Sequence, residues 1–497
     1  MKFKIIKKKE KKDPKYDVIL EIDHWNDYSF ETIFAVYFKL ANKFEERGAI
    51  KIGKKDLDLN KHISIYLPET FNSLDSKFFS IGASVGYYKS ILKLSENKRK
   101  EYYTALNDLA FKGEIDQEIE QSDVFKKAFL RTTTKLPITG QYHRLATGND
   151  STERFSLKYV LKELELTFKV EPNQLPSTNL HAIIGDNGAG KTFILNDIVK
   201  FYKHSSNSDG ELDCDPRSFA NMIYISFSAF DDISAETIDH SLIDNFSYVG
   251  IKELKTDKSG ITDLNQFPHH KGSQDINKEF EDSLKRCVKY KKMNYWYEVI
   301  GAFKNNSIYR NYLEPTILLS DDDFITVISE SFERFSSGHK IALLVLTKLI
   351  EKLEEKSIIL FDEPETHLHP PLLSTLIRCI SSLVTKKNGI AIISTHSPVV
   401  LQEIPSSCVW KVYRNGLYSK AERPQVESFG ENLGILTREV FGYELLNTGF
   451  YKILSDTVEN TQDDYEAIIN KFNNELGWEA RSLLRSLINQ RKNSEED

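Results

Sequence analysis

Several features that mark specialised classes of protein are scarce in this sequence of 497 residues. It contains four cysteines, which lie far apart and show no paired CxxC spacing: Cys214, Cys287, Cys379 and Cys408. A disulfide scaffold of the secreted type is therefore not expected, and we predict reduced thiols. The longest apolar stretch, residues 341–350, is interrupted by Thr347 and Lys348. Because a membrane-spanning helix needs roughly 20 apolar residues, none is predicted.

Positive charge is also in deficit, since the net charge is −7 at pH 7. A nucleic-acid partner would therefore need a local basic patch. The lysine-rich segment 2–15 is a candidate, although runs of this kind are more often solvated strand edges or tails. The segment is basic but has neither an apolar stretch nor a small-residue cleavage site. We therefore predict that it is not a signal peptide and that the protein is cytoplasmic.

The composition, 40% hydrophobic and 28% charged, is that of a folded protein, and no internal repeat is found. The apolar spacing predicts a helix over residues 32–45, helices over 79–130 and one long helix over 277–303. Further on, continuous apolar strands at 357–361 and 390–394 alternate with helices at 340–353 and 371–384. Strands of this kind, separated by helices, predict an α/β fold with a parallel sheet buried on both faces.

One motif predicts a phosphate-binding loop. The run Gly185-Asp186-Asn187-Gly188-Ala189-Gly190-Lys191-Thr192 follows an apolar strand and precedes a helix expected over 192–202. It matches the GxxxxGK[ST] pattern in its strand–loop–helix context. Glycines let successive N–H groups turn toward phosphates, Lys191 would reach the β- and γ-phosphates, and the Thr192 hydroxyl would ligate Mg²⁺. The sequence therefore predicts ATP and Mg²⁺ as ligands.

A second motif is an apolar strand that ends in two carboxylates, Asp362 and Glu363. The carboxyl end of a strand in an open parallel sheet is where ligands bind, so both side chains are expected beside the phosphate loop. Asp362 would hold Mg²⁺ through water. Glu363 is the candidate general base for the attacking water. The alternative is that the acidic pair only caps the next helix.

Three further motifs follow a fixed order along the chain. First, Ser336, Ser337 and Gly338 open an apolar helix. Next comes the run Asp362-Glu363-Pro364-Glu365-Thr366-His367-Leu368-His369-Pro370, and last His396, which follows a strand. Together with the phosphate loop, this order resembles ABC-type ATPases of the RecF, OLD and SMC-like branch over residues 155–410. The resemblance implies that Ser336 to Gly338 contact the γ-phosphate bound by a second subunit. It also implies that His396 is the switch histidine and that the His367 and His369 loop is a dimer contact. A metal site at the two histidines is the alternative.

On this resemblance we expect a P-loop NTPase of ABC-ATPase type with an N-terminal α+β lobe and helical insertions. The predicted segments are an N-terminal lobe (1–78), a helical segment (79–150), the core with the phosphate loop (151–231), a helical insertion (232–330), the core with the signature, acidic strand and switch histidine (331–410), and a partner-binding region (411–497). Two departures from the family are the missing Gln after the strand at 222–227, where Ser226 or Ser228 would substitute, and Ser337 and His339 in the signature.

The sequence from Phe429 to Gly442 and the helical end are similar to ATPase subunits of bacterial antiphage systems, of which the Septu ATPase PtuA is one example. The ABC-type resemblance implies an ATP-hydrolysing homodimer or higher oligomer, and this second likeness implies that it regulates an effector, with an HNH-type nuclease as the partner. DNA is a further candidate partner, and no membrane partner is expected. The alternative function is a RecF-like, ATP-gated DNA clamp. The missing Gln and the Asp362–Pro370 run disfavour a transporter ATPase, and the signature and His396 disfavour a small-molecule kinase.

Overall fold

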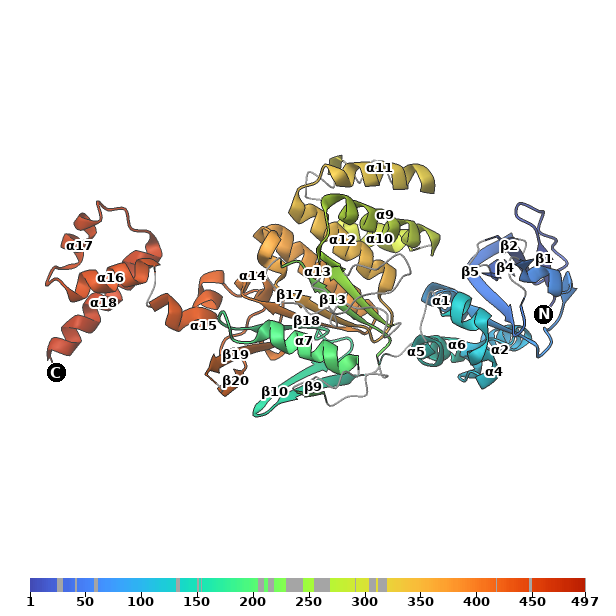
Figure 1. The fold of residues 1–497 in the computed structure, drawn as a ribbon, viewed down its shortest axis with the longest axis horizontal. Helices are drawn as coiled ribbons and strands as arrows, with labels where there is room; N and C mark the ends of the chain where they lie inside the picture. Colours follow the sequence, from blue (N-terminus) through green and yellow to red (C-terminus); the bar gives the residue numbers. More distant parts are fainter. Residues whose placement is uncertain are drawn as a thin grey trace.

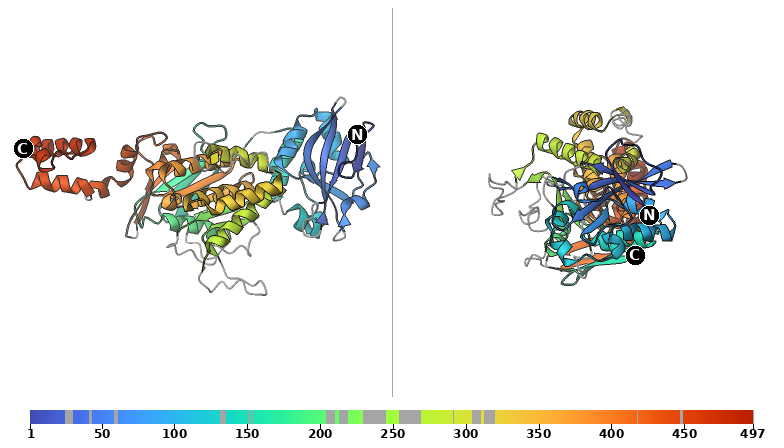
Figure 2. Two further views of the ribbon diagram at one scale, coloured as in Figure 1. Left: turned by 90° about the horizontal axis from the view of Figure 1, so that it is seen from above. Right: turned by 90° about the vertical axis from the view of Figure 1, so that its right-hand side faces the viewer.

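The chain forms three parts that follow one another along an elongated molecule (Figures 1 and 2). An N-terminal domain lies at one end, a central α/β domain in the middle, and a group of helices at the other end. The computed structural model describes residues 1–24, 30–40, 43–57, 61–130, 135–149, 152, 154–203, 210–212, 219–228, 245–253, 269–290, 292–303, 310–311, 320–416, 418–446 and 449–496.

The N-terminal domain is built on a six-stranded sheet of order β7-β1-β2-β4-β5-β8. Its strands are β1 (Phe3–Ile6), β2 (Val18–Asp23), β4 (Ile33–Leu40), β5 (Lys43–Lys54), β7 (Thr70–Phe71) and β8 (Phe78–Gly82). Strands β1 and β2 are parallel neighbours, and the other pairs are antiparallel. The helix predicted over 32–45 is wrong, because β4 and β5 occupy this range. The run in β4 is rich in β-branched and aromatic residues, which favour a strand when a sheet can bury them.

Short helices pack on this sheet and share its core. They are α1 (Val85–Leu92), α2 (Glu96–Ala105), α3 (Leu109–Lys112), α4 (Gln117–Gln121), α5 (Lys135–Pro137) and α6 (His143–Thr147). One hydrophobic core runs from Phe3 to Ala146 and includes the buried Tyr87, Tyr88 and Tyr102. The boundary expected at residue 78 falls inside β8, so residues 1–149 are described together.

The central domain contains a seven-stranded sheet of order β14-β13-β17-β18-β11-β19-β20. Its strands are β11 (Leu180–Ile184), β13 (Met222–Ser226), β14 (Phe246–Gly250), β17 (Ile358–Asp362), β18 (Ile390–Thr395), β19 (Val409–Asn415) and β20 (Tyr418–Glu422). All neighbours are parallel except β19 and β20. Every residue of β11, β13, β17 and β18 is buried. The parallel sheet buried on both faces is therefore confirmed.

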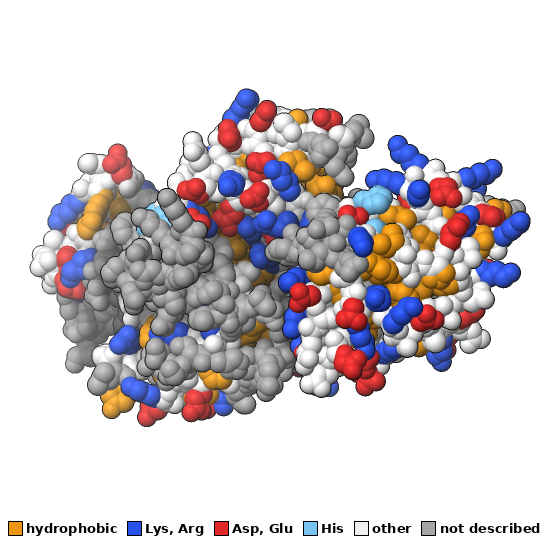
Figure 3. Space-filling model, turned by 45° about the vertical axis from the view of Figure 1, so that its right-hand side comes forward, with side chains coloured by type: hydrophobic (Ala, Val, Ile, Leu, Met, Phe, Trp, Pro, Cys, Tyr) orange, Lys and Arg blue, Asp and Glu red, His pale blue; other side chains and the backbone are white. Residues whose placement is uncertain are grey.

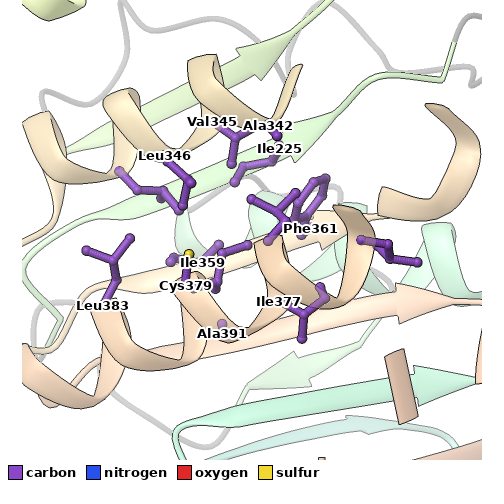
Figure 4. Packing of buried hydrophobic residues seen from close by; sticks show 14 of the residues in the cluster. Ile225, Ala342, Val345, Leu346, Ile359, Phe361, Ile377, Cys379, Leu383 and Ala391 are labelled. Atoms are coloured by element: carbon purple, nitrogen blue, oxygen red, sulfur yellow. The ribbon is translucent and has the colours of Figure 1, made fainter. Parts of the chain in front are cut away.

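Two layers cover this sheet. On one face, α7 (Lys191–Tyr202) packs together with a smaller antiparallel sheet of order β10-β9-β12. The strands of that sheet are β9 (Phe155–Leu161), β10 (Leu164–Val170) and β12 (Glu211–Leu212). The other face is covered by α9 (Ser273–Lys289), α10 (Met293–Ile300), α11 (Asp321–Glu333), α12 (Ser337–Lys352) and α13 (Pro370–Lys386). Figure 4 shows Val345 and Leu346 of α12 and Ile377 and Leu383 of α13 meeting strand residues such as Ile359.

The segment expected as a helical insertion, 232–330, contributes to the central domain where it is described. Strand β14 pairs with β13 at the edge of the large sheet, and α9 packs along α12. The single long helix predicted over 277–303 is wrong, because α9 ends at Lys289 and α10 begins at Met293. Lys292 lies between the two helices in the sequence. Its ammonium donates to the carbonyl oxygens of Ile350 and Glu351, at 3.0 and 2.6 Å. Residues 229–244, 254–268, 304–309 and 312–319 lie outside the described part.

The C-terminal region begins with β19 and β20, which extend the central sheet beyond the boundary expected at residue 410. Four helices follow α14 (Pro398–Leu401) and the hairpin in the described part of this region: α15 (Leu433–Leu446), α16 (Gly449–Glu459), α17 (Tyr465–Lys471) and α18 (Trp478–Glu496). The last three, α16 to α18, extend away from the central domain (Figure 1) and share a small core that includes Val458, Ile468 and Leu484, whereas Leu436 and Val440 of α15 belong to the core of the central domain. No helix in the described part of the chain is long and apolar enough to cross a membrane.

Candidate nucleotide-binding site

The carboxyl ends of four neighbouring strands meet at one edge of the central sheet. The register pairs Ser226 of β13 with Asp362 of β17, and Asp362 with Ser394 of β18. Thr395 of β18 lies opposite Ile184 of β11, which leads into residues 185–192. The sheet therefore brings the phosphate loop, the acidic strand and the strand before His396 to the same edge, as the sequence predicted.

Three glycines shape the phosphate loop for two different reasons. Gly188 and Gly190 have φ angles of 78° and 92°, a left-handed backbone that favours glycine. Gly185 is needed for close packing instead, because a Cβ atom there would lie 2.1 Å from the carbonyl oxygen of Val412 on β19. Asn187 is exposed at the loop tip and Ala189 is buried. The loop thus directs its backbone toward the amino end of α7, a favourable position for phosphate.

Lys191 is 5% exposed and reaches across the mouth of the loop. Its ammonium donates to the carbonyl oxygens of Gly185 and Asp186, at 3.1 and 3.3 Å, and lies 2.6 Å from His396 Nε2. Burial lowers the pKa of Lys191, while the carboxylate of Glu363 and those of Asp362, Glu365 and Asp186 act in the opposite direction. The lysine is therefore a desolvated cation aimed at the loop, where an anionic phosphate would stabilise its charge.

Thr192 and Asp362 present the oxygen atoms that a hard cation prefers. The Thr192 hydroxyl donates to Asp362 Oδ1 at 3.2 Å, and the Ser394 hydroxyl donates to the same oxygen. Asp362 is 1% exposed. A buried carboxylate beside a hydroxyl at the phosphate loop matches the ligand chemistry of Mg²⁺. Thr192 and Asp362 thus fit the cation that the sequence predicted.

Glu363 and His396 lie next to this pair. Glu363 Oε1 is 3.4 Å from His396 Nε2, and the Glu363 backbone adopts a left-handed φ of 44°, which is uncommon for a residue other than glycine. The neighbouring His396 ring and the Lys191 ammonium lower the pKa of Glu363. The side chain is 31% exposed and carries an ionised carboxylate, so it can accept a proton from water at this edge.

Glu365 is a site residue to which sequence reasoning assigned no role. Its Oε1 atom accepts hydrogen bonds from the Thr395 hydroxyl, at 2.9 Å, and from the backbone N–H of His396. The residue lies in the acidic run that the sequence singled out, two positions after Glu363. Ser394, which donates to Asp362, was missed as well. Only the pairing of β17 with β18 brings these residues together.

The signature residues have other neighbours. Ser336 precedes α12 and is exposed. Its hydroxyl oxygen lies 2.7 Å from the Nδ1 atom of His339. Ser337 is also exposed, whereas Gly338 is buried, and a Cβ atom there would lie 2.7 Å from the His367 carbonyl oxygen. None of the contacts found in the described part of the chain joins these residues to the phosphate loop of the same chain.

The side chains of His367 and His369 each form a hydrogen bond with a backbone group, a distant one for His367 and a local one for His369. His367 Nε2 lies 3.0 Å from the carbonyl oxygen of Phe227, and His369 Nδ1 accepts from the N–H of Leu372 at the start of α13. No group of three or more metal-ligating side chains is found among the described residues. These contacts give the pair a structural role and do not favour the alternative of a metal site. Ser226 and Ser228, considered as substitutes for the missing Gln, are both buried.

A pocket of about 420 Å³ lies beside the phosphate loop. It is formed by the turn between β9 and β10, the start of α7, and the β19–β20 hairpin. Phe193, 43% exposed, and Tyr418, 76% exposed, bring aromatic rings to it, and Arg414 and Glu163 add charge. An aromatic pocket next to a phosphate loop is suited to a nucleotide base.

The sheet order, the phosphate loop, the acidic strand and the helix that begins after Ser336 define a P-loop ATPase of the ABC type. A family model described as "AAA domain, putative AbiEii toxin, Type IV TA system" matches residues 302–402. Protein ea59 of Escherichia phage lambda is 34% identical over 515 residues, covering 95% of each chain. The chain belongs to the same family as this phage protein.

Solved structures with partial likeness include an SMC head bound to the C-terminal winged-helix domain of ScpA and an ATP-binding cassette of an ABC transporter in its ADP conformation. The first is 15% identical, covers 55% of this chain and 97% of its own, and has a TM-score of 0.27. The second is 13% identical, covers 52% of this chain and 87% of its own, and has a TM-score of 0.26. The topology and motifs of this chain themselves define the ABC-type class.

Proposed function

We propose that this protein binds ATP with Mg²⁺, hydrolyses it, and uses its nucleotide state to control an effector in defence against phage. One observation carries the enzymatic part: Lys191, Thr192, Asp362, Glu363 and His396 come from three separate stretches of chain and converge within hydrogen-bonding or ion-pair distance. Such a cluster of charged groups beside a phosphate loop is hard to explain by folding alone.

Each residue has a distinct task in this proposal. The backbone of residues 185–192 and the Lys191 ammonium bind the phosphates, and the base lies in the pocket lined by Phe193 and Tyr418. Thr192 and Asp362 hold Mg²⁺, which supplies charge stabilisation at the transferred phosphoryl group. Glu363 orients the attacking water and accepts its proton. His396, placed between Lys191 and Glu363, senses the γ-phosphate end of the nucleotide.

The proposed assembly is a head-to-tail dimer. Ser336 and Ser337 are exposed at the amino end of α12, a helix of 16 residues whose first N–H groups form an anion site. In the ABC arrangement, these groups close over the nucleotide of a second copy. A nucleotide whose phosphate contacts both copies binds the closed dimer more tightly than the open one. ATP would therefore shift the equilibrium between open and closed dimers toward the closed state.

The proposed role in defence rests on the relatives of this chain. The description of the matching family as a putative AbiEii toxin supports a role in conflict between phage and host, and the relative ea59 comes from a phage. The C-terminal helices, which extend from the central domain, are the proposed site for the effector. From the resemblance stated above, an HNH-type nuclease is the proposed effector.

ATP hydrolysis by the purified full-length chain tests the enzymatic part. The wild type is expected to release phosphate, Lys191→Ala to lose ATP binding, and Glu363→Gln to bind ATP but hydrolyse it at least about a hundredfold more slowly, because an amide cannot accept the proton of water. Lys200→Ala, also on α7 but outside the cluster, is the matched control. Wild-type turnover by Glu363→Gln would exclude Glu363 as the base.

A further inference from the structure

The connection between β1 and β2 is unusually rich in lysine. Residues 7–17 contain six lysines and three acidic residues. Residues 1–149 contain 27 Lys and Arg against 21 Asp and Glu, a net charge of +6, whereas the whole chain has −7. The N-terminal domain is therefore a basic module on an acidic chain. Strands β1 and β2 are parallel neighbours, so residues 7–17 must cross back over the sheet, and we call them the lysine crossover.

The lysine crossover is anchored on the sheet. Lys12 Nζ lies 3.8 Å from the centre of the Tyr37 ring on β4 and 3.3 Å from Glu21 Oε2 on β2. The Lys39 ammonium of β4 donates to the carbonyl oxygen of Pro14 at 2.6 Å. These contacts hold the crossover in a defined path. Edge protection does not explain its lysines, because they lie outside any strand.

The acidic residues near the crossover are engaged by backbone N–H groups. Glu10 accepts from the N–H of Lys7, Asp13 from that of Lys15, and Asp17 from that of Lys2, at 2.8 to 3.0 Å. Six lysines are exposed and form no ion pair within the described part of the chain: Lys2, Lys7, Lys8, Lys9, Lys11 and Lys15. The carboxylates thus shape the crossover, and the ammonium groups face solvent as a dense cationic surface.

We propose that the lysine crossover binds the phosphate backbone of a nucleic acid. Compact, flexible ammonium groups suit a regular row of phosphates, and they give binding that is independent of base sequence. A membrane surface is a poorer match, because stable peripheral binding combines basic residues with an apolar anchor. Of the large apolar side chains described as exposed, Ile65 is the one in residues 1–149, and it lies outside the crossover.

The position of the crossover separates it from the nucleotide site. Figure 1 places β1 at the outer end of the N-terminal domain, and Figure 3 shows Lys and Arg side chains projecting around the rim of that domain at the right of the view. The domain meets the central one through Arg144 and Glu355, and Glu355 precedes β17, at the edge of the sheet opposite the phosphate loop. Nucleic acid bound here would lie away from a cleft between two ATPase domains.

The test measures binding of a fluorescein-labelled random-sequence DNA duplex to the full-length chain over a range of salt concentrations. The variant replaces Lys7, Lys8, Lys9 and Lys11 by Gln. The matched control replaces four other exposed lysines of the domain by Gln: Lys93, Lys98, Lys112 and Lys126. Both variants lose the same charge, and thermal unfolding checks that each is folded.

The crossover variant is expected to bind DNA at least about tenfold more weakly, and its slope of log affinity against log salt should decrease by about 0.9 per lost contact, roughly three to four units in total. The control should stay within about threefold of the wild type. Equal weakening in both variants would show a diffuse charge effect and overturn the proposal, as would binding to anionic vesicles without binding to DNA. Lys191→Ala should retain DNA binding, so failure of this proposal and failure of the proposed ATPase are distinguishable.

Discussion

Glu363 and Glu365 are two positions apart and make different contacts. Glu363 faces His396 and Lys191, where water and phosphate would meet, whereas Glu365 holds the backbone N–H of His396 and the hydroxyl of Thr395. The first is therefore a candidate catalytic residue and the second a positioning residue. The backbone at Glu363 is left-handed, and strain of this kind is often found at functional sites.

This difference predicts distinct effects of substitution at Glu365. Glu365→Ala should lower kcat about tenfold to a hundredfold with little change in KM, because His396 loses the acceptor that positions it. Glu365→Gln should recover most of the rate, since its amide oxygen can accept the same two hydrogen bonds. Steady-state kinetics on both variants measures this. Equal loss in Glu365→Gln and Glu365→Ala would show that the charge, and not the positioning, is what matters.

The site could be predicted from the sequence as far as its local motifs extend. Lys191, Thr192, Asp362, Glu363 and His396 were expected to gather, and the structure places them together, because parallel strands expose their carboxyl ends at one edge. Glu365, Ser394 and Tyr418 could not be assigned in this way. Their positions depend on the pairing of β17 with β18 and on the β19–β20 hairpin, which no local pattern specifies.

At the scale of elements, α3 begins at a buried carboxyl group. Asp108 accepts a hydrogen bond from the N–H of Phe111 at 2.9 Å and from the Tyr88 hydroxyl at 3.1 Å, and it is 1% exposed. Burial raises the pKa of Asp108 from 3.8 to about 7, and the hydrogen bonds from Phe111 and Tyr88 oppose this shift. The helix cap is therefore sensitive to pH.

The raised pKa sets the direction of a pH effect on stability. Between about pH 4 and pH 7 the folded state keeps the Asp108 proton and the unfolded state loses it, so stability falls as pH rises through this window, by about 1.4 kcal/mol per unit. Asp108→Asn should be close to the wild type near pH 4 and more stable than it at pH 8. Urea unfolding at several pH values measures the difference. A difference that does not change with pH would contradict the shift.

Elements next to the motifs were predicted to within a few residues, and α1 to α4 confirm the helices predicted over 79–130, whereas the helix predicted over 32–45 is wrong. Helices α12 and α13 and strands β17 and β18 have strong periodicity and short connections, so their patterns are unambiguous. The apolar run in β4 is compatible with either a helix or a strand, and pairing with β2 and β5 decides it. The break between α9 and α10 depends on Lys292, whose contacts with α12 are long-range.

At the scale of the whole molecule, a buried ion pair joins two parts of the chain. Arg144 of α6 pairs with Glu355, which is 4% exposed and lies between α12 and β17. Nearby, burial lowers the pKa of Lys387 to about 8. The contact between the domains is thus built from desolvated charges, and such contacts are sensitive to the loss of one partner.

Arg144→Ala should therefore destabilise the contact between the N-terminal and central domains by about 3 kcal/mol, because Glu355 stays buried without its guanidinium partner. Lys100→Ala, which breaks an exposed pair with Glu96, is the control and should have no measurable effect. Calorimetry of the full chain measures both. A cooperative transition unchanged by Arg144→Ala would mean that other contacts hold the domains together.

The shared ATP site is the central claim, and mixing two inactive variants tests it most directly. Lys191→Ala cannot bind ATP but still presents Ser336, whereas Ser336→Arg binds ATP but cannot close over the nucleotide of a second copy. Each variant alone should be inactive, and the mixture should regain part of the wild-type hydrolysis, because one mixed site is intact in each mixed dimer. Cross-linking confirms that the subunits exchange. Full activity of Ser336→Arg alone at low concentration would contradict the account, since it would show that a single chain hydrolyses ATP without a partner.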